Sequence, residues 1–189
     1  MLIQTALKEW SVAVDALANG DTTVLLRKGG IRESQGKFSA ESETVILFPT
    51  FEHQKAELLK PKYRDGVVPV APGWHPDTIT LKAWASITHI FLTTSVDNVA
   101  SLADFHIWQP QLAQERLKWK ASQPLYVLML RVYRLPAPMP IPWQADYGGC
   151  RSWISLETPL SLTESAELAA VSDEVYGRQV SAIAQMLGE

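Results

Sequence analysis

Residues 125–135, LYVLMLRVYRL, constrain the fold most, because this run of strand length is largely apolar on both faces. A strand of that kind is typical of the middle of a sheet, where other layers cover both of its faces. A second long strand is predicted over residues 78–94, where apolar side chains alternate from Ile79 to Ile87. The two runs predict that a sheet forms the centre of the fold.

The other predicted elements come in a mixed order along the chain. They are a helix over residues 2–18, strands over 22–27 and 44–48, helices over 51–60, 96–103 and 110–119, a strand over 150–156 and a helix over 163–187. This order is neither alternating strand and helix nor all strand. We therefore expect an α+β fold with a small, mostly antiparallel sheet or β-barrel and flanking helices. We expect one domain over residues 1–189, with a C-terminal helical element over about 161–189.

Local signals mark the ends of several of these elements. Gly20 lies where a left-handed cap would end the first helix, and Thr50 is placed to cap the helix over residues 51–60. Ser95 is placed to cap the helix over 96–103, and Pro110 suits the first turn of the helix over 110–119. Prolines and glycines recur between residues 61 and 77, which predicts a loop. The polar stretch over residues 34–43 is expected to be exposed.

Composition limits the class of protein. Apolar residues make up 47% and charged residues 20% of the chain, which fits a globular domain and excludes a disordered or collagen-like chain. Lys and Arg number 17 against 20 acidic residues, so the overall charge carries no signature of polyanion binding. The single cysteine, Cys150, excludes an internal disulfide and a zinc site built on several cysteines.

Membrane insertion is not predicted. The sequence has no stretch of 18 uncharged apolar residues, and its beginning carries Lys8, Glu9 and Asp15, unlike a signal peptide. We therefore expect a cytoplasmic protein without a membrane partner. The histidines show no metal-ligand spacing with one another or with Cys150, so neither a metal nor a cofactor is predicted.

A glycine pair between cationic residues is the densest polar signal. Arg27 and Lys28 precede Gly29-Gly30, and Arg32 follows. A glycine pair lets main-chain N–H groups form an anion-binding nest, and three adjacent cations would suit a phosphate or carboxylate. A solvated turn with ordinary surface charges would explain the same residues, so both interpretations stay open.

Glu52 and His53 form the candidate acid–base pair. Histidine titrates near neutral pH, so the two side chains could transfer protons. On a helix, however, adjacent residues point in different directions and would not easily face one substrate. In the alternative interpretation, His53 occupies the capping-box position three residues after Thr50 and has a structural role.

Two of the seven tryptophans lie among turn residues. Trp74 occurs in Pro-Gly-Trp-His-Pro and Trp143 in Pro-Trp-Gln. Aromatic side chains on loops can stack on a nucleobase or another flat ligand. Packing under a proline-rich loop is the structural alternative for each of them.

Several phrases spread over nearly the whole chain resemble one bacterial family. They are LKEWSVAVDAL, LLRKGGIRE, LFPTFEHQ, FHIWQPQLAQERLKWK, PLYVLMLRVYRLP and YGGCRSW. The family they resemble is the domain of unknown function 1802 (DUF1802). Some of its members adjoin a restriction-endonuclease-like domain, so the resemblance implies, by association, a role in DNA restriction or modification.

A more distant resemblance concerns the segment from Gly20 to Arg27. A helix that ends in glycine and is followed by a strand with a fixed arginine is similar to the opening of the ASCH domains, which belong to the PUA-like barrel superfamily. Their motif is Gly-x-Lys-x-x-Glu-x-Arg, and here Thr22 and Leu25 replace its Lys and Glu. Any catalytic role of those two positions is therefore not carried over. The resemblance implies a PUA-like fold and the binding of RNA or of modified bases.

Three functions remain open at the level of sequence. The first is a nucleic-acid-binding, PUA-like module that holds DNA or RNA with the cations around Gly29-Gly30 and stacks a base, in particular a modified one, on a loop tryptophan. The second is an enzyme for a small anionic substrate that uses Glu52 and His53. The third is an adaptor that presents residues 136–142 as an extended ligand. The sequence does not fix an oligomeric state.

Overall fold

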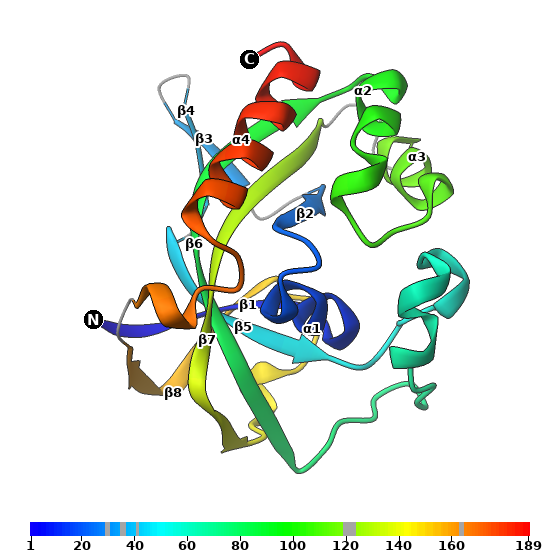
Figure 1. Ribbon diagram of the computed structural model, residues 1–189. Coiled ribbons are helices and arrows are strands. Elements are labelled where there is room, and N and C mark those ends of the chain that lie inside the picture. The colour runs from blue at the N-terminus through cyan, green and yellow to red at the C-terminus, as the bar shows by residue number, and fades with distance from the viewer. Residues whose placement is uncertain (29–30, 35–36, 41, 119–123, 163–164) are drawn as a thin grey trace.

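A six-stranded sheet forms the centre of the computed structural model, which describes residues 1–28, 31–34, 37–40, 42–118, 124–162 and 165–189 (Figure 1). The strand order is β2-β7-β6-β5-β1-β8. The strands are β1 (Leu2–Trp10), β2 (Val24–Arg27), β5 (Thr44–Thr50), β6 (Thr78–Thr93), β7 (Leu125–Pro142) and β8 (Trp153–Ser161). Neighbours pair antiparallel except β1 and β5, which are parallel. A separate hairpin joins β3 (Ile31–Ser34) to β4 (Lys37–Ala40).

Strand β7 is the central strand that the sequence predicts. It lies between β2 and β6 in the sheet, and the side chains from Val127 to Leu130 are fully buried on both of its faces. The second half of β7 carries proline at alternate positions from Pro136 to Pro142 and pairs with β6. Alternate residues direct their main-chain nitrogen atoms to the same side of a strand, so the missing N–H groups all fall on the side away from β6.

The sheet curls around its own core. Leu7, Leu25, Leu47, Ala83 and Leu128, each from a different strand, are almost fully buried and belong to one hydrophobic cluster. The curl brings β2 opposite β1, although the two strands are not neighbours in the strand order. This arrangement positions the candidate site described below.

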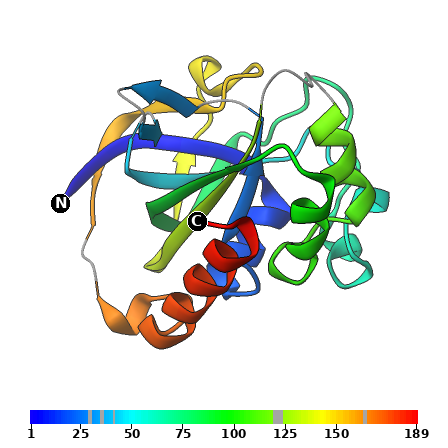
Figure 2. The ribbon, with the colours of Figure 1, turned by 90° about the horizontal axis from the view of Figure 1, so that it is seen from above.

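Helices cover the curled sheet. They are α1 (Ser11–Asn19), α2 (Val96–Ser101), α3 (Pro110–Lys118) and α4 (Asp173–Leu187). Helix α1 follows β1 directly and α2 lies beside α3, while α4 crosses the β6–β7 pair (Figure 2). The α+β fold, with its mostly antiparallel sheet and flanking helices, is confirmed. Among the described residues, no helix is long and apolar enough to cross a membrane.

Three predicted helices differ from the structure. Residues 2–10 form strand β1, because pairing with β5 and β8 outweighs their helical spacing, and the helix begins only at Ser11. Residues 51–60 form a turn followed by a short 3₁₀-helix (Ala56–Leu58) rather than an α-helix, with His53 at a positive φ of 62°. Helix α4 begins at Asp173, where the Ser172 hydroxyl accepts a hydrogen bond from an N–H of the first turn.

Other boundaries also shift. The polar stretch over residues 34–43 includes strand β4, and the last strand runs from Trp153 rather than from Cys150. The predictions for β6, α2 and α3 are confirmed, including the Ser95 cap of α2.

Candidate functional site

A cavity of about 670 Å³ opens where β1, β2 and β5 end. Because β1 and β5 are parallel, their carboxyl ends lie at the same edge of the sheet, and the curl adds the end of β2. We call it the cationic cavity. Its lining residues are Lys8, Glu9, Trp10, Leu26, Arg27, Lys28, Thr50, Glu52, His53, Arg116, Gly149, Cys150, Arg151 and Ser152.

The lining carries more positive than negative charge. Five of the residues are Lys or Arg, and two are carboxylates. All five cations donate hydrogen bonds to main-chain carbonyls: Lys8 to Tyr147 (2.6 Å) and Gly149 (2.7 Å), Arg27 to Lys8 (3.4 Å), Lys28 to Leu117 (3.2 Å), Arg116 to Leu26 and Arg151 to Asp146 (2.5 Å). A carbonyl oxygen holds a side chain in place but does not neutralise it. The lining as a whole therefore carries an excess of positive charge.

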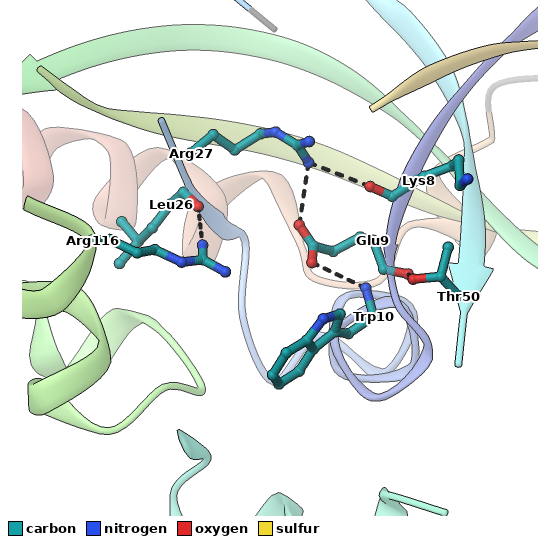
Figure 3. A network of polar contacts seen from close by, with 7 residues as sticks. All are labelled: Lys8, Glu9, Trp10, Leu26, Arg27, Thr50 and Arg116. Atoms are coloured by element: carbon teal, nitrogen blue, oxygen red, sulfur yellow. Dashed lines mark hydrogen bonds and ion pairs between the residues drawn. The ribbon is translucent and has the colours of Figure 1, made fainter. Parts of the chain in front are cut away.

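Glu9 and Arg27 form an ion pair across the wall of the cavity (Figure 3). The Arg27 Nη1 lies 3.2 Å from the Glu9 Oε2, and the two side chains are only 11% and 9% exposed. The other carboxylate oxygen of Glu9 accepts a hydrogen bond from the main-chain N–H of Trp10 at 3.0 Å. The hydroxyl of Thr50 donates to the carbonyl of Glu9, also at 3.0 Å. These contacts tie the ends of β1, β2 and β5 together.

Burial affects the proton affinity of two lysines in the cavity. It lowers the pKa of Lys8, and the nearby guanidinium of Arg151 lowers that pKa further. Burial also lowers the pKa of Lys28. An anion bound between these ammonium groups would oppose both effects by favouring the charged form.

Replacing Glu9 with glutamine should lower the free energy of unfolding by about 1–2 kcal/mol, because the buried guanidinium of Arg27 loses its counter-charge while the amide keeps the size of the side chain. Urea unfolding at pH 7 measures this change. Glu174→Gln is the matched control, since the Glu174–Arg178 pair is largely exposed and should contribute almost nothing. Equal stabilities of the two variants would contradict a structural role for the Glu9–Arg27 pair.

The structure places Glu52 and His53 together in the lining of the cationic cavity. The objection that adjacent helical residues diverge does not apply, because these residues lie in a turn. The side chain of His53 is exposed. The carboxylate of Glu52 accepts a hydrogen bond from the main-chain N–H of Gly73, which ties it to the loop before β6.

The two loop tryptophans lie elsewhere. Trp74 packs edge-on against Phe51, with ring centroids 5.8 Å apart, and lines a different cavity. Trp143 stacks on His75, with centroids 3.4 Å apart. Of the glycine-turn residues, Arg27 and Lys28 line the cationic cavity. Gly29 and Gly30 lie outside the described residues, as does the side chain of Arg32.

Several lining residues were not predicted from the sequence. Lys8, Glu9 and Trp10 fall within the helix predicted over residues 2–18, whereas in the structure they are the last residues of β1. The feature that could have identified these residues is a strand that passes directly into a helix, because the ends of such strands commonly form ligand-binding sites. Arg116 and Arg151 are not among the predicted site residues. Arg151 follows the Gly148-Gly149 turn, which resembles the setting of Arg27 beside Gly29-Gly30.

Three solved structures are similar to this chain. The crystal structure of ASCH from Zymomonas mobilis has a TM-score of 0.49 and 14% sequence identity, and the match covers 81% of this chain and 87% of that one. Two mutant forms of that protein give TM-scores of 0.46 and 0.47 with 12% and 15% identity, over 81% of this chain and 87% and 89% of theirs.

Sequence comparison gives the family. No curated protein matches the chain. The family model described as "Domain of unknown function (DUF1802)" matches residues 6–182, which is most of the chain and includes every lining residue of the cationic cavity. The family predicted from the sequence phrases is thus confirmed, and the chain belongs to the DUF1802 family.

Proposed function

We propose that this protein is a nucleic-acid-binding module and that its cationic cavity receives one nucleotide of the bound strand. The observation that carries the proposal is the excess of positive charge in the cavity, held in place by main-chain carbonyls. Phosphate groups are recognised by Lys and Arg, and prepositioned cations lose little conformational entropy on binding. An overall charge of -3 does not oppose this function, because the positive charge is concentrated locally.

The size and walls of the cavity suit a nucleotide rather than an inorganic ion. Its volume of about 670 Å³ lies in the usual range for small-molecule sites. Trp10 supplies an aromatic wall and is braced edge-on by Trp108, with ring centroids 5.0 Å apart. An indole next to phosphate-binding cations can stack on the base of the same nucleotide. Trp10 is therefore the candidate stacking residue of the cationic cavity, whose lining includes neither Trp74 nor Trp143.

A cavity in the protein surface cannot receive a base that remains stacked in a duplex. The strand must be single, or the nucleotide must be turned out of the helix. A site that encloses a turned-out base can also distinguish bases by their exocyclic groups, so the proposal extends to modified bases. The proposed connection with DNA restriction or modification rests on the family resemblance alone.

Replacing Arg151 with glutamine should weaken oligonucleotide binding about 5- to 10-fold and reduce the dependence of log K on log salt by about one. Arg151 is exposed and reaches the cavity from the loop before β8, so the fold should tolerate the change. The measurement is fluorescence anisotropy with labelled single- and double-stranded DNA and RNA, at low and near-physiological salt. Binding of the wild-type protein to none of these strands at low salt would contradict the proposal.

Two further variants sharpen this experiment. Arg178→Gln removes the same charge from the exposed face of α4, away from the cationic cavity, and should leave binding almost unchanged. Glu9→Gln adds one net positive charge to the cavity and should tighten binding several-fold, even though it lowers stability. Equal losses of oligonucleotide affinity in Arg151→Gln and Arg178→Gln would show that overall charge, and not the cationic cavity, determines binding.

The alternative function is an enzyme for a small anionic substrate. It is favoured by one observation, which is that Glu52 and His53 line the cavity together with the cations. In that case His53→Gln should abolish turnover of a phosphate-containing substrate while its binding persists. Loss of binding without any detectable turnover in the wild-type protein would instead favour the binding module.

A further inference from the structure

A second cavity of about 410 Å³ lies on the other side of residues 49–53. Thr50 and Glu52 line the cationic cavity, whereas Pro49 and Phe51 line the second one. Pro49 and Thr50, at the end of β5, point to opposite sides of the strand, and Phe51 and Glu52 continue this division into the turn that follows. This short segment therefore separates the two cavities. The wall of the second cavity is completed by α1, by the start of β6 and by the loop that carries Trp74.

The charges in the second cavity balance, in contrast to those of the cationic cavity. Its charged residues are Asp15 and Lys82, whose side chains form an ion pair at 2.6 Å and are each nearly half exposed. Thr78 and Thr80 add hydroxyl groups from the same face of β6 as Lys82. Such a wall offers both donors and acceptors but no net charge. It suits a neutral ligand that has donors and acceptors on its edge.

Trp74 supplies the flat wall of this cavity. It is 44% exposed, which is unusual for so large an apolar side chain. Its ring is held at 88° to that of Phe51, and the neighbouring Gly73 N–H donates to the carboxylate of Glu52. The indole is therefore positioned before any ligand arrives, which reduces the entropic cost of stacking on it.

We propose that the second cavity binds a neutral, planar nitrogen heterocycle of the nucleobase type, stacked on Trp74 with its polar edge toward Asp15, Lys82 and the threonine hydroxyls. An aromatic face supplies the stacking energy, and the balanced polar edge selects a ring with donors and acceptors over an aliphatic group or an ion. This inference goes beyond the proposed function, because it requires neither a phosphate group nor a cation of the cationic cavity.

Free nucleosides test this site without a contribution from phosphate. Adenosine, guanosine, cytidine and uridine are titrated to millimolar concentration while the indole N–H resonances are followed by NMR. We expect at least one nucleoside to shift the Trp74 resonance with little dependence on salt. Trp74→Ala should weaken that binding about 10-fold or more, and Trp74→Phe should retain most of it. Thermal unfolding of both variants checks that they are folded.

The same titration separates this proposal from the proposed function. Arg151→Gln should leave nucleoside binding unchanged, so a failure of the cationic cavity to bind phosphate would not affect the result. If none of the four nucleosides shifts the Trp74 resonance, or if Trp74→Ala binds them as well as the wild-type protein does, the second site is overturned. If Trp74→Ala also loses oligonucleotide affinity while the salt dependence of binding stays unchanged, the heterocycle bound in the second cavity is a base of the bound strand. An unchanged oligonucleotide affinity would identify a free nucleoside as the ligand.

Discussion

Replacing Gly20 with alanine should lower the free energy of unfolding by about 3 kcal/mol, a sum of backbone strain and overpacking. Gly20 ends α1 with a left-handed φ of 78°, which disfavours a residue with a Cβ atom. A Cβ at this position would also lie 2.5 Å from the main-chain oxygen of Ala170 and 2.9 Å from the Val171 side chain. Because the closer neighbour is backbone, a rotamer change cannot relieve the contact. Urea or thermal unfolding measures the loss.

Gly188→Ala separates the two contributions. Gly188 ends α4 with almost the same φ, 77°, but no described residue beyond its chain neighbours and its own helix backbone has an atom within 4 Å of the position of its Cβ. This variant should therefore show the backbone strain alone, about 1 kcal/mol. The excess loss in Gly20→Ala then measures the close approach of the segment before α4 to the end of α1. If the two variants lose the same stability, that close approach contributes nothing.

Stability should fall steeply in acid because of His106. This side chain is 3% exposed, and its pKa is lowered from 6.5 to about 4 by burial and by the nearby charge of Lys60. The unfolded chain therefore takes up a proton between pH 6.5 and pH 4 that the folded protein does not. The contribution of the neutral ring is complete above pH 6.5 and is lost as the pH falls to about 4, a change of roughly 3 kcal/mol.

His106→Asn is the variant that isolates this effect. The Nδ1 of His106 accepts a hydrogen bond from the main-chain N–H of Trp108, two residues later, at 3.2 Å. An asparagine oxygen can accept the same bond as an Asx turn but cannot take up a proton in this range. Unfolding free energies at pH 7 and pH 4.5 should therefore diverge, with the wild-type protein losing more than the variant. Parallel pH profiles would show that another group controls the acid sensitivity.

Elements with strong local signals could be predicted from the sequence. The alternation in β6 and the doubly apolar run of β7 gave the centre of the sheet, and Ser95 and Pro110 marked the starts of two helices. Strand β1 could not be predicted in this way. Its residues also fit a helical face, and its strand form depends on pairing with β5 and β8, which lie far away along the chain.

The candidate site shows the same division between local and long-range information. Residue type singled out Arg27, Lys28, Glu52 and His53, and all four line the cationic cavity. Their proximity depends on the curl of the sheet, which no local pattern encodes. The turn chemistry around Trp74 predicted a loop correctly but not the cavity that its side chain would line. Arg116, which comes from a helix beside the sheet, gave no local signal.

The proline-bearing half of β7 protects the molecule from adding strands at this edge. An incoming strand needs N–H donors as well as carbonyl acceptors along the edge that it joins. On the side of β7 away from β6, the four alternate prolines from Pro136 to Pro142 offer only acceptors. A long, flat edge would otherwise template intermolecular β-structure. The sequence that extends the central strand beyond its core therefore also disfavours the pairing of a neighbouring copy along this edge.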